Sequence, residues 1–114
     1  MIQFVNARDP RITRVLALME QQREKPMTIS ELACAVNLST SYLTRLFREA
    51  TGISPAEYYR LQRLDHAHEL VVSSFLTVKE IMAAVGWNDP SHFSREFKRR
   101  FGSSPRTLRV RLRG

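Results

Sequence analysis

The stretch that decides the fold is residues 85–98, which read VGWNDPSHFSREFK. Gly86 is typical of a helix end, and Asp89 followed by Pro90 is typical of the start of the next helix. The apolar side chains beyond this start recur every four residues and so share one helix face, at Phe93, Phe97 and Phe101. The stretch predicts a tight turn that leads into a helix with one apolar and one polar face.

The same arrangement occurs earlier in the chain. Thr28 and Glu31 have the spacing of a capping box and recur forty-nine residues later as Thr77 and Glu80. Beyond the turn the offset is fifty, so the second turn contains one additional residue. The matching residues there are Arg45, Phe47, Gly52, Ser54 and Pro55 in the first copy and Arg95, Phe97, Gly102, Ser104 and Pro105 in the second. The chain therefore carries one structural unit twice.

Helix starts and ends can be placed along the whole chain. Capping residues, prolines and apolar spacing predict seven helices, the first over about 10–23, the second over 29–36 and the sixth over about 90–101. We expect an all-α, homeodomain-like fold in which two helix-turn-helix units are joined by a long linker helix. The expected organisation is a single domain over residues 1–114, with unit 1 at about 10–53, the linker helix at about 55–73 and unit 2 at about 77–110.

The charge of the chain favours a polyanionic partner. It has 18 Lys and Arg residues against 11 Asp and Glu, which gives a formal net charge of +7. Fifteen of the basic residues are Arg, whose planar guanidinium pairs bidentately with phosphate or with guanine. At 114 residues the chain is long enough to bury one core. Nucleic acid is therefore the expected partner.

Nothing in the sequence points to export or to a membrane. No apolar stretch approaches the roughly 18 to 20 residues of a membrane span, and residues 1–9 lack a signal-peptide core. The lone Cys34 is expected to be a small buried side chain, because its neighbours are apolar. We expect a cytoplasmic, nucleoid-associated protein that does not bind membranes.

Two predicted helices have the same polar pattern opposite their apolar faces. At positions i, i+3, i+4 and i+7 the first carries Ser41, Thr44, Arg45 and Arg48, and the second carries Ser91, Ser94, Arg95 and Lys98. Small residues let a helix enter the major groove, and Arg can bind O6 and N7 of guanine. Because the pattern is duplicated after two capped turns, we interpret both helices as DNA recognition helices.

The expected length of the linker helix indicates how the two units can bind DNA. A helix of about eighteen residues is about 27 Å long, comparable with the roughly 34 Å of one DNA turn. The two recognition helices can therefore enter successive major grooves of double-stranded DNA. One polypeptide then does what other helix-turn-helix proteins do as dimers, so we expect a monomer on an asymmetric site.

These residues resemble the DNA-binding domain of the AraC/XylS family of bacterial transcription regulators. The resemblance covers roughly residues 10–109 and is carried by residues 42–48, YLTRLFR, and by residues 85–98. It implies base contacts from Ser41, Thr44 and Arg45 in unit 1 and from Pro90, Ser91, His92, Ser94 and Arg95 in unit 2. It implies phosphate contacts from Thr40, Arg48, Lys98 and Arg99.

The resemblance also implies a function. A member of this family regulates transcription as a sequence-specific DNA-binding protein, acts as an activator through contact with RNA polymerase, and needs neither enzymatic chemistry nor a cofactor. The chain is similar both to short stand-alone members and to the DNA-binding part of a longer regulator, and both alternatives stay open.

Two other function classes compete with this interpretation. A metal or acid-base site would use His66, His68 and His92, but His66 and His68 stand two residues apart and point about 200° apart on a helix. A membrane-surface or protein-interaction module would use the basic tail as an extended arm, with Arg106, Arg109, Arg111 and Arg113. The salt dependence of binding distinguishes a DNA-binding protein from a membrane-surface module. DNA binding weakens steeply with ionic strength, whereas membrane binding depends on the content of anionic lipid.

Overall fold

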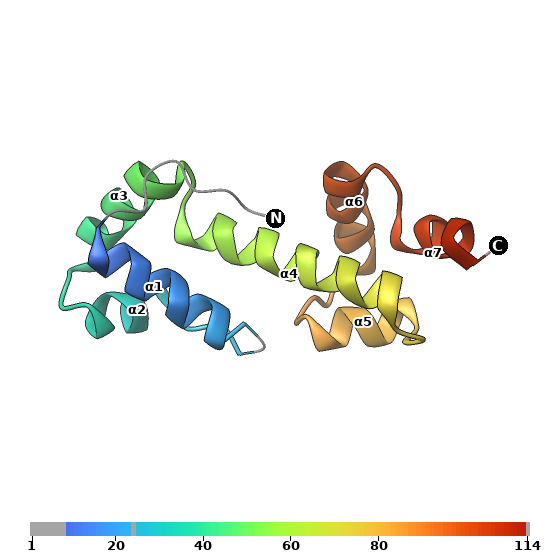
Figure 1. Cartoon of the computed structure of the whole chain (residues 1–114), viewed down its shortest axis with the longest axis horizontal. Coiled ribbons are helices and arrows are strands. Elements are labelled where there is room, and N and C mark those ends of the chain that lie inside the picture. Colours follow the sequence, from blue (N-terminus) through green and yellow to red (C-terminus); the bar gives the residue numbers. More distant parts are fainter. Residues whose placement is uncertain (1–8, 24, 114) are drawn as a thin grey trace. The chain divides into compact units, whose positions relative to one another are not determined.

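The computed structural model describes residues 9–23 and 25–113, and this part of the chain forms seven α-helices without a strand (Figure 1). The helices are α1 (Pro10–Gln21), α2 (Ile29–Ala35), α3 (Thr40–Thr51), α4 (Pro55–Ser73), α5 (Val78–Ala84), α6 (Pro90–Phe101) and α7 (Pro105–Arg113). The predicted all-α class is confirmed. Within the described residues, no helix combines the length and the apolar character that a membrane span requires.

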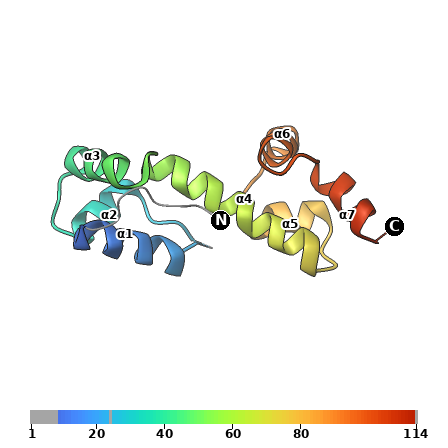
Figure 2. The ribbon, with the colours of Figure 1, turned by 45° about the horizontal axis from the view of Figure 1, so that its top comes forward.

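The chain divides into two compact units, and the division falls inside α4, between Gln62 and Arg63. In unit 1, α1, α2 and α3 pack with the first half of α4 (Figure 1). In unit 2 the second half of α4 lies beside α5, and α6 and α7 complete the unit (Figure 2). Each unit holds one helix-turn-helix, made of α2 and α3 in unit 1 and of α5 and α6 in unit 2.

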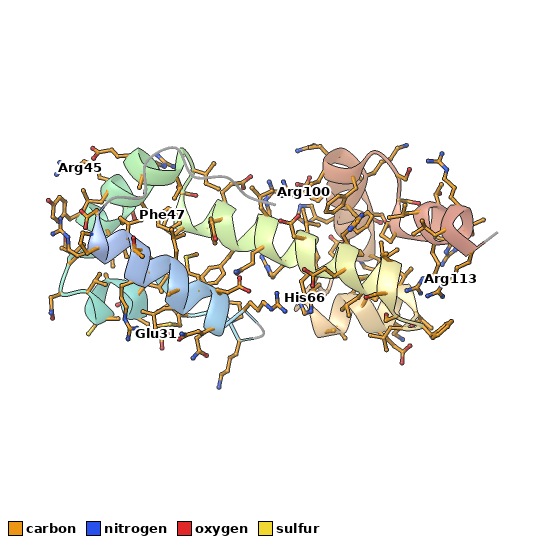
Figure 3. The ribbon with its side chains drawn as sticks, viewed as in Figure 1. Glu31, Arg45, Phe47, His66, Arg100 and Arg113 are labelled. Atoms are coloured by element: carbon orange, nitrogen blue, oxygen red, sulfur yellow. The ribbon has the colours of Figure 1, made fainter. Side chains whose placement is uncertain are left out.

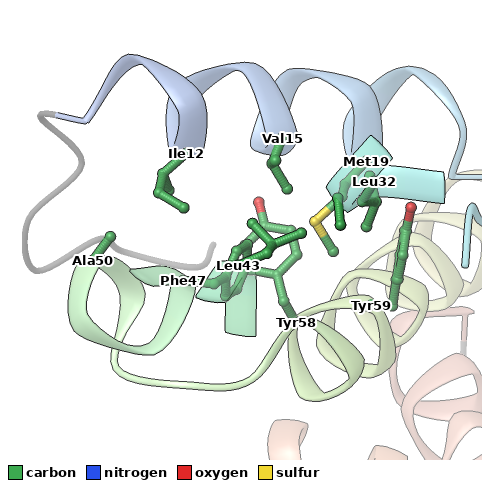
Figure 4. Close-up of a cluster of buried hydrophobic side chains, with 10 residues drawn as sticks. Ile12, Val15, Met19, Leu32, Leu43, Phe47, Ala50, Tyr58 and Tyr59 are labelled. Atoms are coloured by element: carbon green, nitrogen blue, oxygen red, sulfur yellow. The ribbon is translucent and has the colours of Figure 1, made fainter. Parts of the chain in front are cut away.

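The core of unit 1 is built from the apolar faces of all its helices (Figure 4). Tyr58 of α4 meets Phe47 of α3 edge-on, with ring centroids 5.6 Å apart. The Tyr59 hydroxyl accepts a hydrogen bond of 3.2 Å from the backbone N–H of Met27. The fully buried side chains around them are Ile12, Val15 and Met19 of α1, Leu32 of α2 and Leu43 of α3. These contacts hold the inner face of α3 against α1 and α4.

The core of unit 2 repeats this construction and extends the repeat to the first helix. The buried residues in the second half of α4 are Leu64, Ala67 and Val71, and their spacing is that of Ile12, Val15 and Met19 in α1. The second half of α4 therefore takes in unit 2 the place that α1 takes in unit 1. The constant offset of the sequence repeat does not extend to this match, because residues 22–28 separate the two helices in unit 1 and only residues 74–77 separate them in unit 2.

Capping boxes start both short helices, as predicted. The Thr28 hydroxyl accepts from the Glu31 N–H at 3.1 Å, and the Glu31 carboxylate accepts from the Thr28 N–H at 2.9 Å. Thr77 and Glu80 make the same pair of bonds at 3.1 and 2.8 Å. The backbone N–H and the hydroxyl of each Thr hold the pKa of the Glu carboxyl below its usual value, because they stabilise the charged form.

The prediction that the Cys34 side chain is buried is wrong. Cys34 is exposed on α2, because the inner face of this short helix is formed by the neighbouring Leu32 and Ala33. A run of apolar letters does not show which of them faces inward, since successive residues on a helix point about 100° apart.

The basic tail is not an extended arm, because α7 continues to Arg113. The guanidinium of Arg109 is half-buried and donates to the backbone carbonyls of Leu70 and Ser74, each at 3.2 Å, and to that of Leu76. Arg109 thus binds the carbonyl of Leu70 in the last turn of α4 and those of Ser74 and Leu76 just beyond the helix end. The tail therefore contributes to the scaffold of unit 2.

Replacement of Glu80 by Gln tests the contribution of a charged cap, because Gln accepts the same hydrogen bond without titrating. The folded-state pKa of Glu80 is lowered, so its stabilisation is present above the unfolded pKa of about 4.3 and is lost as the pH falls through the folded pKa. We expect E80Q to be less stable than the wild type at pH 7 and to converge with it in acid. Urea unfolding at a series of pH values measures this, with the exposed Glu69→Gln as control. A difference that does not change with pH would contradict the assignment.

Candidate nucleic-acid interface

Each recognition helix starts from a turn that local sequence fixes. Asn37 and Gly86 adopt the left-handed conformation, with φ of 57° and 75°. Asn tolerates this conformation and Gly has no Cβ to oppose it. The side chains of Ser39 and Asp89 then cap α3 and α6, each accepting from the N–H three residues further on, at 3.1 and 3.2 Å. The turn and the cap together set the residue at which each recognition helix begins.

The predicted base-reading residues lie on or beside the outward faces of these helices. Figure 3 shows Arg45 projecting outward from α3, whereas Phe47 points into unit 1. The exposed members of the set are Ser41, Arg45, Pro90, Ser91 and Arg95, and the half-buried ones are Thr44, His92 and Ser94. The predicted phosphate contacts Thr40, Arg48, Lys98 and Arg99 are all exposed. The predicted residues of each unit thus lie on the exposed side of one recognition helix or at the margin of that side.

Tyr42 gathers two Arg side chains at the start of α3. The guanidinium carbons of Arg45 and Arg11 lie 5.0 and 5.6 Å from the centre of the Tyr42 ring. The Asp9 carboxylate accepts from the Arg11 guanidinium at 3.1 and 2.9 Å. The hydrogen bond with Asp9, and after it the one with Tyr42, raises the pKa of Arg11 above its usual value. Arg11 and Tyr42 were not among the predicted site residues, because no local pattern places α1 next to the start of α3.

Trp87 forms the corresponding cluster in unit 2. Its indole Nε1–H donates to Nδ1 of His92 at 3.2 Å, and the two ring centroids lie 5.5 Å apart. The guanidinium of Arg63 lies 5.0 Å from the centre of the Trp87 ring, and one of its nitrogens donates to the carbonyl of Gly86 at 3.4 Å. His92 is therefore held in place by Trp87 from inside the unit.

Two adjacent Arg residues of α6 have different surroundings. The Arg100 guanidinium donates to both carboxylate oxygens of Asp65 in α4, at 2.8 and 3.0 Å, and both side chains are about three quarters buried. The Arg99 side chain is 77% exposed and lies 3.4 Å from the buried Glu96 carboxylate. Arg100 therefore ties α6 to α4, whereas Arg99 remains accessible to a phosphate.

The histidines of α4 form no metal site with their neighbours. The ring of His68 packs on that of Phe101, with centroids 4.4 Å apart. In residues 9–23 and 25–113, no three His, Cys, Asp or Glu side chains lie close enough together to hold a metal ion.

Comparison with known proteins defines the class of this chain. The family model described as a helix-turn-helix domain matches residues 32–111. The regulator GlxA of Rhizobium meliloti is 40% identical over 102 residues, which are 90% of this chain and 32% of GlxA. The regulator GbdR of Pseudomonas aeruginosa is 33% identical over 106 residues, which are 93% of this chain and 29% of GbdR. Both are named HTH-type transcriptional regulators, and the chain spans about a third of their length. The chain therefore contains a helix-turn-helix domain of the kind found in DNA-binding transcriptional regulators, which are a non-enzymatic family.

Solved structures narrow the class. A Chromobacterium violaceum transcriptional regulator described as AraC-type has a TM-score of 0.83 and 31% identity, over 90% of this chain and 92% of that one. The DNA-binding domain of AdpA, solved with a target DNA, has a TM-score of 0.80 and 27% identity, over 90% of this chain and 93% of that one. The chain belongs to the AraC-type helix-turn-helix family of DNA-binding transcriptional regulators.

Replacement of Arg100 and of Arg99 by Ala distinguishes a structural from an exposed basic residue. We expect R100A to lower the free energy of unfolding of unit 2 by about 1.5 to 3 kcal/mol, because it leaves the Asp65 carboxylate without its guanidinium. We expect R99A to change it by less than about 0.5 kcal/mol, since Arg99 is exposed. Chemical denaturation measures both, and a double-mutant cycle with Asp65→Ala isolates the pair. Equal effects of the two variants would contradict this distinction.

Proposed function

We propose that this protein binds an asymmetric promoter site as a monomer, inserts α3 and α6 into successive major grooves, and activates transcription. The observation that carries the proposal is the duplicated outward face. Each recognition helix presents two hydroxyl side chains and one exposed Arg in the same register, and each is buried on its opposite face. The buried face fixes the helix in its unit, and the short side chains on the exposed face keep the helix thin enough to enter a groove about 12 Å wide.

The proposed base-reading roles follow the chemistry of each side chain. Arg45 and Arg95 are exposed and carry the planar fork that binds O6 and N7 of guanine. Ser41, Ser91 and Ser94 are short and permit close approach. Thr44 donates its hydroxyl hydrogen to the Thr40 carbonyl at 2.8 Å, so it offers DNA an acceptor and a methyl group. Pro90 contributes a flat apolar contact at the first position of α6.

The proposed phosphate contacts lie outside the apolar faces of the same helices. Thr40, Arg48, Lys98 and Arg99 are exposed, and neutralising phosphates with such side chains supplies affinity without reading sequence. The last turn of α6 carries three basic residues, of which Lys98 and Arg99 are exposed and Arg100 is paired with Asp65. The phosphate-directed charge is therefore greater at this end of α6 than at the corresponding end of α3, where the last turn carries Arg48 alone.

Binding as a monomer is supported by the presence of two proposed recognition helices in one chain. The α4 helix that joins the units has 19 residues, which corresponds to about 28 Å, close to the roughly 34 Å of one DNA turn. Selection of bound sequences from a random duplex library, followed by footprinting, tests this proposal. One asymmetric site of about 20 base pairs, protected in two successive major grooves at a stoichiometry of one chain, is the expected result.

Activation is proposed to occur through contact with RNA polymerase. A Staphylococcus xylosus relative, 35% identical over 78 residues that are 68% of this chain and 28% of that protein, is named a lactose operon transcription activator. In vitro transcription with purified bacterial RNA polymerase, from a promoter that carries the selected site, tests this role. Reduced transcript at every position of the site would make the protein a repressor instead.

Insertion of about five base pairs between the two half-sites turns one of them to the opposite side of the duplex. We expect a loss of affinity of at least about tenfold, because one chain can then place only one recognition helix in its groove. Gel-shift titration measures the change, and the same insertion beyond the end of the site is the control. Unchanged affinity would contradict binding to two successive grooves.

Replacement of Arg95 and of Lys98 by Ala separates base reading from phosphate binding on one helix. We expect R95A to cost about 1 to 3 kcal/mol on the selected site and to relax the preference at one base pair. We expect K98A to weaken binding to selected and random DNA alike, and to lower the slope of log affinity against log salt by about one. Fluorescence anisotropy at several salt concentrations measures both. If K98A relaxed the base preference and R95A weakened binding to all DNA alike, the proposed roles of Arg95 and Lys98 would be wrong.

A further inference from the structure

The two units carry an aromatic ring at the same place, where the recognition helix begins. His92 stands fifty residues after Tyr42, and each lies three residues before the exposed Arg of its helix. Each unit also places an Arg from its first helix on an aromatic ring at this place. Arg11 directly precedes Ile12, the first buried residue of α1, and lies over Tyr42. Arg63 directly precedes Leu64, the first buried apolar residue in the second half of α4, and lies over Trp87. Both units therefore share this arrangement of an Arg on an aromatic ring, but the ring at the start of the recognition helix is Tyr42 in unit 1 and His92 in unit 2.

In unit 2 the hydrogen bond from Trp87 determines which nitrogen of His92 carries the proton. Nδ1 accepts the indole N–H at 3.2 Å, so Nδ1 is unprotonated. The proton of the neutral ring is then on Nε2, which is the nitrogen farther from the backbone. His92 thus keeps one hydrogen-bond donor for a partner and has no free acceptor.

Trp87 is itself fixed on several sides. Only 7% of its surface is exposed, and its ring lies 5.6 Å from that of Phe93, centroid to centroid. Its backbone N–H donates to the carbonyl of Met82 at 2.8 Å. The Arg63 guanidinium lies over the ring. The indole N–H is therefore already oriented before any DNA binds, which is what a positioning group requires.

His92 lies at the edge of the proposed reading face of α6. It is half-buried and precedes Arg95 by three residues, a spacing that puts two side chains next to each other on a helix. Its ring is therefore close enough to the outward face for Nε2 to reach a base edge beside the base that Arg95 binds.

We propose that Trp87 is a positioning residue that fixes His92 as a hydrogen-bond donor only, so that unit 2 rejects cytosine at the base that His92 contacts. In the major groove guanine offers N7 and O6, adenine offers N7 and thymine offers O4 as acceptors, whereas cytosine offers only the donor N4 amino group. A donor-only imidazole finds a partner on three bases and meets a second donor on the fourth. This inference rests on the proposed entry of α6 into the major groove.

The first experiment examines the free protein. Long-range proton–nitrogen correlation spectra of histidine-labelled chain, recorded at about pH 8 to observe neutral rings, report which nitrogen is protonated. We expect His92 to be protonated on Nε2 in the wild type and to exchange between the two tautomers in Trp87→Phe. His66 and His68 serve as internal controls, since neither contacts the indole N–H. The same single tautomer in Trp87→Phe would overturn the positioning role of Trp87.

The second experiment examines DNA. Library selection with the wild type is expected to show one base pair, next to that read by Arg95, at which cytosine is disfavoured about tenfold. Trp87→Phe keeps an aromatic ring in the core but allows Nε2 to accept from cytosine, so we expect it to lose this discrimination while keeping the preference set by Arg95. His92→Ala, which changes a half-buried side chain and leaves Trp87 in place, is expected to lose all preference at that base pair.

The outcomes separate this inference from the proposed function. Full tolerance of cytosine by the wild type, with the Arg95 preference intact, would overturn the donor role of His92 and leave groove binding by α6 in place. Absence of any enriched sequence would overturn the proposed function itself. If Trp87→Phe does not fold, the wild-type spectrum still tests the inference, because a His92 ring protonated on Nδ1 would overturn it. His92→Ala then still tests whether His92 contacts that base pair.

Discussion

Each unit depends on the burial of the apolar face of its recognition helix. Phe47 in α3 and Phe93 and Phe97 in α6 are fully buried. Because side chains leave a helix at intervals of about 100°, fixing these rings inward also fixes the residues that point outward. The left-handed turn residue and the helix cap then set where each recognition helix begins.

The two units use one scaffold for two different surfaces. Capping boxes, left-handed turn residues and buried Phe rings are common to both. At the start of the recognition helix, however, unit 1 presents a phenol ring flanked by Arg11 and Arg45, and unit 2 presents an imidazole held by Trp87. A duplicated scaffold with unequal surfaces supports the proposal that one chain binds an asymmetric site.

Interactions between residues close together in the chain could be predicted from the sequence, whereas interactions between distant residues could not. Caps and turns act within three or four residues, so Thr28 with Glu31 and Thr77 with Glu80 could be identified from spacing alone. The placement of Cys34 failed, because a seven-residue helix such as α2 is too short for its apolar periodicity to show which side is buried. The partners of Arg63 and Arg100 lie 24 and 35 residues away in the chain, and no local pattern points to them.

The sequence by itself determined the all-α class, the helix starts, the duplicated unit and the residues that share the outward face of α3 and of α6. These follow from caps and from helical periodicity, which are local properties of the chain. Only the tertiary structure decided which neighbour each of these residues has. The contacts of Arg11 with Tyr42 and of Arg63 with Trp87 depend on how helices pack, and packing brings together residues that the sequence does not relate.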